Sequence, residues 1–290
     1  MDYSDNRSID LHIHSNASDG TFSPQEIIAL AQRLRLSAIA ITDHDTIDGS
    51  KEAIVSGIPS ELNFLTGVEL SAEPPLSFQF SGSFHILGYS FRTDDHTLNN
   101  TLHTLKAARK NRNPKIIELL NNLGFDITIE EVIALAGEGQ IGRPHIATLM
   151  MKKGFVESIS KAFDKYLGRG KPAYVDKYRL ECSKALEMIT GAGGVPVIAH
   201  PSLFTIGEGK NFEDLIAVLK DMGLKGIEAY YPEHSKDKIS YYVEIAKKHG
   251  LLLTGGTDFH GSLKPDISMG SGRGDFHVPY LLYENLIKSV

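Results

Sequence analysis

The chain has 290 residues, an apolar content of 41% and a formal net charge of −6. This length allows one large domain, or one domain with a smaller one attached. The negative charge argues against wide coverage of a nucleic-acid duplex, which needs a basic surface. Cys182 is the only cysteine, which excludes an intramolecular disulfide and a thiolate zinc cluster.

The N-terminal stretch is polar, and the sequence contains no apolar run of about 18 residues. We therefore expect a cytoplasmic protein with no membrane partner. A small anionic substrate held by metal ions in a cleft remains compatible with the charge.

The first 90 residues predict strands that alternate with helices. Residues 9–13 can form a short strand, and residues 23–26 (SPQE) match a capping box with proline at the first helical position. Residues 38–42 are an apolar run of the kind found in buried parallel strands. Residues 64–68 and 84–89 are further strand candidates.

The middle of the chain predicts helices alone, and the alternation then resumes. Helices are expected at 97–110, 114–123, from 128 onward, at 144–153 and at 158–167. Later helices at 181–190, 212–222 and 235–249 each precede a strand, at 195–199, 226–229 and 251–254. An α/β series is thus interrupted by a helical block, which predicts three parts: 1–96, 97–171 and 172–290.

Residues 10–14 (DLHIH) place two histidines two positions apart at the end of a strand. Side chains at i and i+2 point the same way on an extended chain, so His12 and His14 could bind one ion. Two surface histidines would give the same pattern, and this motif alone is a weak signal.

Further ligand-type residues also follow predicted strands. The carboxyl ends of parallel strands converge on one face, so we expect these side chains to form one site. His85 fits less well, because it lies near the start of its strand; either that strand is antiparallel or its boundary is misplaced. The set comprises Asp19, His44, Glu69, His200, Asp258 and His260.

Imidazole and carboxylate ligands without thiolate suit Mn, Fe or Zn better than Mg or Ca. The set is too large for one ion, and a carboxylate such as Glu69 is the natural bridge between two. Asp43 and Asp45, which flank His44, are expected to orient ligand imidazoles.

Four segments resemble the motifs of the polymerase-and-histidinol-phosphatase (PHP) superfamily: 10–14 (DLHIH), 42–45 (TDHD), 199–201 (AHP) and 258–260 (DFH). The resemblance implies a distorted seven-stranded β/α barrel with a helical insertion and a trinuclear metal site. It implies one ion on His12, His14, Glu69 and Asp258, a second on Glu69, His85 and His200, and a third on Asp19, His44 and His260. Some members have histidine where this chain has Asp19. The implied catalytic residues are His12, His14, Glu69, His200, Asp258 and His260.

Residues 142–145 (GRPH) resemble the branch that contains nucleoside 3′,5′-bisphosphate phosphatases and 5′-to-3′ exonucleases acting on short 5′-phosphorylated RNA. The resemblance implies that Arg143, His145 and His234 face the substrate. Arginine grips phosphate bidentately, and a helix N-terminus adds backbone donors. Alternatively, Arg143 could be a surface arginine at the start of a helix, and His145 could cap or pack against that helix.

We therefore expect a phosphoesterase that uses two or three divalent ions, Mn foremost, and a metal-activated hydroxide that attacks phosphorus in line. Its substrate would be a nucleoside 3′,5′-bisphosphate or a short 5′-phosphorylated oligonucleotide. Three different functions stay open: a histidinol-phosphate phosphatase, a metal-dependent amidohydrolase and a non-catalytic PHP-type metal-binding module. The helical block disfavours a histidinol-phosphate phosphatase. The lack of a suitable lysine at a strand end disfavours an amidohydrolase, and the complete ligand set disfavours a non-catalytic module.

Overall fold

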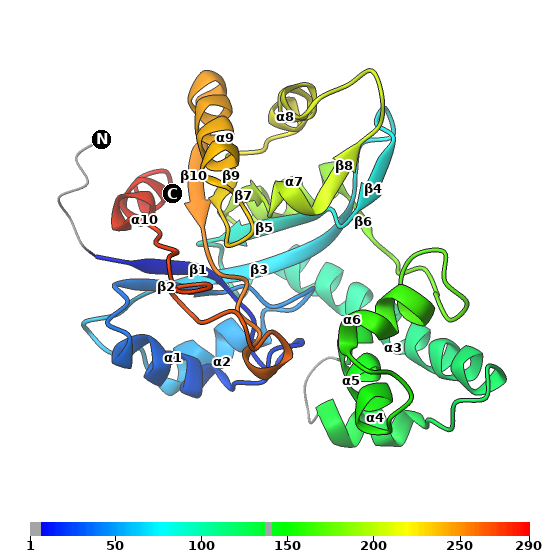
Figure 1. Cartoon of the computed structure of the whole chain (residues 1–290). Coiled ribbons are helices and arrows are strands. Elements are labelled where there is room, and N and C mark those ends of the chain that lie inside the picture. The colour runs from blue at the N-terminus through cyan, green and yellow to red at the C-terminus, as the bar shows by residue number, and fades with distance from the viewer. Residues whose placement is uncertain (1–6, 137–140) are drawn as a thin grey trace.

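The computed structural model describes residues 7–136 and 141–290. Seven strands follow one another around the main sheet (Figure 1). Their order is β1 (Ile9–Ile13), β2 (Ala38–Ile41), β3 (Asn63–Glu73), β5 (His85–Tyr89), β7 (Val195–Ile198), β9 (Gly226–Tyr230) and β10 (Leu252–Gly255). The short strand β6 (Leu180–Glu181) pairs with the end of β3.

Strand direction explains the position of His85. β1, β2 and β3 run parallel to one another, as do β7, β9 and β10. β5 runs antiparallel to both of its neighbours, β3 and β7. The start of β5 therefore lies at the same edge as the ends of the other strands, which confirms the antiparallel direction considered for this strand.

The segment after β10 returns to β1 and nearly closes the sheet. The backbone N–H of His14 donates to the carbonyl of Phe259 across 2.9 Å, and Ile13 pairs with Phe259 in a parallel bridge. The N–H of Thr257 donates to a carboxylate oxygen of Asp10 across 2.9 Å. The predicted fold class, a distorted α/β barrel, is confirmed.

Helices cover the barrel on both sides in the view of Figure 1. α7 (Cys182–Gly191), α8 (Phe212–Asp221) and α9 (Lys236–His249) pack on one buried cluster, and α10 (Tyr280–Ile287) packs on another. α1 (Pro24–Arg33) and α2 (Asp48–Ser56) join a third. Most strand residues that do not belong to the polar cluster described below are apolar, because the strands are covered on both faces.

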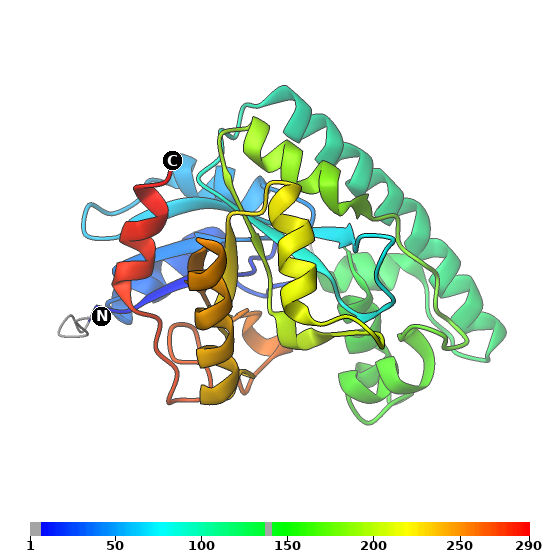
Figure 2. The same ribbon diagram turned by 90° about the horizontal axis from the view of Figure 1, so that it is seen from above.

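A separate helical region extends to one side of the barrel (Figure 2). It contains α3 (His96–Asn122), α4 (Ile129–Ala136), α5 (Arg143–Lys152), α6 (Ile159–Ala162) and a π-helical turn, Phe163–Leu167. These elements share a buried cluster of their own. The boundaries at 96/97 and 171/172 stay predictions.

Two predictions about this region were wrong in detail. Pro114 does not separate two helices, because α3 continues through it. Proline removes one backbone hydrogen bond, but Leu98 and Leu105 anchor the first half on the barrel and Ile116 anchors the second half in the helical cluster. The helix expected at 158–167 is instead α6 followed by the π-helical turn.

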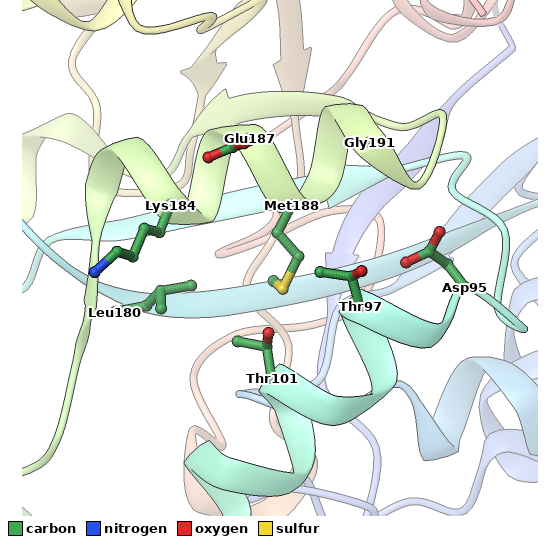
Figure 3. A pocket seen from close by; sticks show the side chains of 8 residues that line it. All are labelled: Asp95, Thr97, Thr101, Leu180, Lys184, Glu187, Met188 and Gly191. Carbon is green, nitrogen blue, oxygen red and sulfur yellow. The ribbon is translucent and has the colours of Figure 1, made fainter.

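Some elements were not expected from the sequence. β4 (Phe80–Gly82) and β8 (Phe204–Ile206) form a short antiparallel ribbon, and α10 follows the last strand. A hollow of about 410 Å³ lies between α3 and α7, with Thr101 on one side and Lys184 on the other (Figure 3). It contains no histidine and lies apart from the cluster described below. Among residues 7–136 and 141–290, no helix has the length and apolar character needed to cross a membrane.

Candidate metal centre

The structure brings all nine predicted metal ligands to one end of the barrel. Most of them follow strands that run toward this end, and His85 begins the one strand of the sheet path that runs the other way. All are buried except His44, whose side chain is 16% exposed. The nine are His12, His14, Asp19, His44, Glu69, His85, His200, Asp258 and His260.

One group of donors consists of His12, His14, Glu69 and Asp258, as the sequence implied for the first ion. Nε2 of His12 lies 3.2 Å from Nε2 of His14. Nε2 of His14 also lies 3.1 Å from Oδ1 of Asp258 and 3.2 Å from Oε2 of Glu69. One donor atom from each of the four lies within 4.8 Å of the others, which is close enough for a single ion.

Glu69 faces two sides of the cluster. Its Oε1 lies 2.7 Å from Nδ1 of His85 and 2.7 Å from Nε2 of His200. Its Oε2 lies 3.0 Å from Nδ1 of His44 and also faces His12 and His14. This division of the two oxygens suits a carboxylate that bridges two ions.

A further group of donors contains Asp19, His44 and His260, as expected, and also His14. Oδ1 of Asp19 lies 3.5 Å from Nε2 of His260 and 3.7 Å from Nδ1 of His14. Oδ2 of Asp19 lies 4.0 Å from Nε2 of His44. His14 therefore faces both this group and the first one.

The buried polar atoms of the cluster fit divalent cations. Oδ1 of Asp19, Nδ1 of His44 and Oε2 of Glu69 make no hydrogen bond within the described residues. Such atoms cost about 1–3 kcal/mol each when they are left unpaired, and a cation would satisfy all three. The imidazole–carboxylate donor set suits Mn, Fe or Zn.

The charge states also suit cation binding. Burial raises the pKa of Glu69, but His44, His85 and His12 outweigh it and hold this pKa well below its usual range. Burial lowers the pKa of His44 and of His260. Glu69 is thus held as an ionised carboxylate and His44 and His260 as neutral imidazoles, which are the forms that bind metals.

His14 differs from those two imidazoles. Burial lowers its pKa, but Asp258 and Glu69 outweigh burial and raise this pKa to about 9. The carboxylates therefore attract a positive charge to this position. A divalent cation would take the place of that proton.

Glu228 supports the cluster and was missed by the sequence analysis. Its Oε1 accepts a hydrogen bond from Nδ1 of His12 at 2.8 Å, and its Oε2 accepts one from the backbone N–H of His200 at 2.6 Å. A carboxylate within the apolar strand β9 (GIEAY) was the available signal. Glu228 thus fixes the ring of His12 and the backbone of His200, two of the proposed ligands.

Asp258 is held by one of its two oxygens. Its Oδ2 accepts hydrogen bonds from the hydroxyl of Tyr231 at 3.1 Å and from Nζ of Lys264 at 2.6 Å. Its Oδ1 faces His12 and His14. The arrangement leaves one oxygen for an ion.

The expectation that Asp43 and Asp45 orient ligand imidazoles was wrong. Asp43 accepts hydrogen bonds from the N–H of Ser15 at 2.8 Å and from the hydroxyl of Ser18 at 2.6 Å. Asp45 accepts from the N–H of Ser71 at 2.8 Å and pairs with Arg109. Both carboxylates are therefore bonded to groups other than the imidazoles of the donor cluster.

The backbone around the site is tightly constrained. Asp45 and Asp258 both have φ of 55°, a left-handed conformation that non-glycine residues rarely adopt and that is enriched at functional sites. At Gly256, a Cβ atom would lie 2.3 Å from the backbone nitrogen of His12. Glycine there lets the segment that carries Asp258 pass directly beside β1.

A pocket rich in cations adjoins the donor cluster. Arg109, Arg112, Arg143 and Lys177 line a cavity of about 220 Å³ together with Asp19, His44 and His85. Asp45 pairs with Arg109 and so balances one of the four cations. Arg112 is 6% exposed, and its Nε makes no hydrogen bond within the described residues. Burial, with Arg109 and Arg143, lowers the pKa of Arg112 to about 9.

The three predicted substrate residues differ in their surroundings. Nη1 of Arg143 donates to the carbonyl of Leu167 across 2.9 Å, and the side chain lines the cation pocket. Nδ1 of His145 accepts from the N–H of Gly142 at 3.0 Å, which is a helix-capping contact. Nδ1 of His234 donates to the carbonyl of Ala229 at 2.8 Å, and its buried Nε2 makes no hydrogen bond within the described residues.

A second, larger cavity of about 600 Å³ opens over the cluster. Its lining includes Glu69, His200 and Asp258 on the barrel side, and Phe163 on the helical side. Arg109, Arg112 and Lys177, which line the smaller cavity, were also missed by the sequence analysis. They belong to no motif, and the fold alone brings them to the cluster.

Comparison with known proteins places this geometry in a family. The PHP domain family matches residues 10–253. The chain is 34% identical to a 5′-3′ exoribonuclease of Haemophilus influenzae, over 88% of this chain and 90% of that protein. It is 32% identical to a 3′,5′-nucleoside bisphosphate phosphatase of Chromobacterium violaceum, over 87% of each.

A solved structure agrees with these relatives. A candidate metal-dependent phosphoesterase of Bifidobacterium adolescentis superposes with a TM-score of 0.85 at 28% identity, over 98% of this chain and 96% of that one. The predicted enzyme class, a hydrolase of phosphate esters, is thereby confirmed, and the chain belongs to the PHP domain family.

Proposed function

We propose that the chain hydrolyses a phosphate ester of a nucleotide that carries a second phosphate, with two or three divalent ions, Mn²⁺ foremost. The substrate would be a nucleoside 3′,5′-bisphosphate or a short 5′-phosphorylated oligonucleotide. The observation that carries this proposal is the cation pocket of Arg109, Arg112, Arg143 and Lys177, which shares Asp19, His44 and His85 with the donor cluster. A cytoplasmic location, which cell fractionation would test, completes the proposal.

The donor cluster would bind the ester to be cleaved. Divalent ions at such a site supply Lewis acidity, which makes water nucleophilic at neutral pH and neutralises phosphoryl oxygens. Glu69 would hold two ions together, because its two oxygens face different histidines. Tyr231 and Lys264 would keep Oδ1 of Asp258 directed at the cluster.

The cation pocket would bind the second phosphate. Four buried or half-buried cations outnumber the two carboxylates beside them, Asp19 and Asp45, and leave an excess of positive charge. Arginine suits phosphate because its planar fork donates bidentate hydrogen bonds. The names of the two relatives support this substrate class, since they refer to a nucleoside bisphosphate and to RNA.

Histidinol phosphate is a poorer candidate. Its ammonium group would meet Arg109, Arg112 and Lys177 if its phosphate were held at the donor cluster. Like charges brought together in a partly desolvated pocket repel strongly. A bisphosphate experiences attraction at the same position.

A non-catalytic module and an amidohydrolase also fit this cluster less well. A non-catalytic module would be expected to lose ligands, whereas each donor position of this chain carries a ligand-type residue. In an amidohydrolase-type site a carboxylated lysine commonly bridges the ions. Here Glu69 occupies the centre of the cluster, between His85, His200 and His44.

A substrate comparison tests the proposal. The protein is stripped with a chelator and reloaded with Mn²⁺, and phosphate release is then measured from adenosine 3′,5′-bisphosphate, 5′-AMP and histidinol phosphate. We expect kcat/KM for the bisphosphate to exceed the other two by about 10-fold or more, because a charged hydrogen bond to a second phosphate contributes about 1.5–3 kcal/mol. Preference for histidinol phosphate, or release that does not depend on metal, would refute the proposal.

A further inference from the structure

Phe163 lines both cavities at the donor cluster, the smaller cationic one and the larger one. It is the first residue of the π-helical turn Phe163–Leu167, in which the N–H of Gly168 donates to the carbonyl of Phe163 across 2.9 Å. Single π-helical turns are uncommon and occur frequently at functional sites. The turn presents an aromatic ring at the boundary between the two cavities.

Arg143 ties this turn to the cation pocket. Its Nη1 donates to the carbonyl of Leu167, the last residue of the turn, and its guanidinium carbon lies 5.7 Å from the centre of the Phe163 ring. The arginine proposed to hold phosphate therefore also fixes the segment that carries the aromatic ring.

The lining of the larger cavity includes apolar side chains beside its polar and charged ones. Pro144 and Ile159 lie on the helical side, and Leu263 and Ile267 line it from the segment after β10. Its volume of about 600 Å³ suits a ligand of nucleotide size. An aromatic face, apolar side chains and adjoining phosphate-binding groups form the combination that a nucleoside requires.

We propose that Phe163 stacks on the base of the substrate while the ester lies at the donor cluster and the second phosphate lies in the cation pocket. This inference rests on the proposed function and narrows it, because it requires an aromatic base between the two phosphate sites. Every base has a π-face, so the stacking contact would accept any of them.

Phe163 also packs on the buried cluster of the helical region, so truncation to alanine would damage the core. Phe163→Leu keeps an apolar side chain and removes the flat ring, whereas Phe163→Tyr keeps the ring. Phe155→Leu is a matched control. Phe155 packs on the same cluster and lines neither of the two cavities.

The test uses the full-length, Mn²⁺-loaded protein and two substrates. One is adenosine 3′,5′-bisphosphate, and the other is 1,2-dideoxyribose 3,5-bisphosphate, which lacks the base. We expect Phe163→Leu to raise KM for the adenosine compound about 10-fold, since base–aromatic stacking commonly contributes this much. It should leave KM for the base-free compound unchanged. Phe163→Tyr and Phe155→Leu should match the wild-type protein on both substrates.

If Phe163→Leu raised KM equally for the two substrates, Phe163 would have a purely structural role and the inference would be overturned. An unchanged KM for the adenosine compound would overturn it as well. Either result leaves the proposed function intact if the wild-type protein hydrolyses the adenosine compound. A wild-type protein inactive on both compounds would overturn this inference, and one that is also inactive on a short 5′-phosphorylated oligonucleotide would overturn the proposed function as well.

Discussion

Nδ1 of His12 donates a hydrogen bond to Oε1 of Glu228 across 2.8 Å, although 216 residues separate the two in the chain. Both side chains are fully buried. The bond fixes the histidine ring so that Nε2 faces the donor cluster, 3.4 Å from Oε2 of Glu69. The other oxygen of Glu228 holds the backbone of His200.

Glu228→Gln should weaken Mn²⁺ binding. An amide has one acceptor oxygen, so it cannot serve both His12 and His200. Loss of such a supporting contact lowers metal affinity about 10- to 100-fold. Isothermal titration of the chelator-stripped protein with Mn²⁺ measures the change.

Glu213→Gln is the matched control for this experiment. Oε1 of Glu213 also lies 3.0 Å from a histidine nitrogen, Nε2 of His249, but this pair joins α8 to α9 and lines neither cavity at the donor cluster. The control should bind Mn²⁺ as the wild-type protein does. Wild-type affinity in Glu228→Gln would contradict a supporting role for Glu228.

His14→Ala and Glu69→Ala should each abolish phosphate release while the chain stays folded. His14 faces two groups of donors, and Glu69 faces both sides of the cluster. Each change therefore removes a donor shared between ions. Kinetic assays with Mn²⁺, paired with circular dichroism, provide the measurement, and full activity in either variant would remove the cluster from the mechanism.

Arg143→Ala should raise KM for adenosine 3′,5′-bisphosphate about 10-fold or more, because it removes a charged donor from the cation pocket. It also releases the carbonyl of Leu167. Arg92→Ala is the control, since Arg92 is 60% exposed and pairs with Asp95 at the start of α3. An unchanged KM in Arg143→Ala would show that Arg143 does not contact the phosphate.

Lys177 should make substrate binding depend on pH. Burial, with Arg109, Arg179 and Arg143, outweighs the attraction of Asp45 and lowers the pKa of Lys177 to about 7. The ammonium loses its charge as pH rises through this value, so KM for the bisphosphate should rise on the alkaline side. Lys177→Arg stays charged and should flatten this limb of the profile.

The same lysine affects stability with a definite sign. Its ordinary pKa is 10.5, so between about pH 7 and 10 the unfolded chain binds more protons than the folded one. The contribution of Lys177 to the free energy of unfolding should therefore increase with pH over this window. Urea unfolding of the wild type and of Lys177→Arg across this pH window measures the contribution. A KM for the bisphosphate that does not change with pH in the wild type would contradict the role of Lys177 in substrate binding.

The sequence could indicate that the proposed ligands lie close together, because several of them follow predicted strands; that they bind metal stays a prediction. His14 and Asp258 lie just after β1 and β10, and the parallel arrangement brings such positions together, whereas Glu69 lies within β3, which continues to Glu73. The antiparallel direction of β5 could not be chosen from local pattern. It depends on pairing with β3 and β7, which are distant in the sequence.

Residues that act through tertiary contacts were beyond the reach of sequence patterns. Arg112 belongs to an ordinary helix, and Lys264 belongs to a glycine-rich segment without a motif; the fold brings one to the cation pocket and the other to Asp258. Pro114 misled the helix prediction because local propensity gave way to packing on both sides of it.

Anomalous diffraction from Mn²⁺-soaked crystals tests the central claim most directly, namely that residues from both ends of the chain bind the same ions. We predict a manganese peak among His12, His14, Glu69 and Asp258, and at least one more on the far side of Glu69. Absence of manganese from the cluster, or peaks confined to other parts of the molecule, would contradict the account.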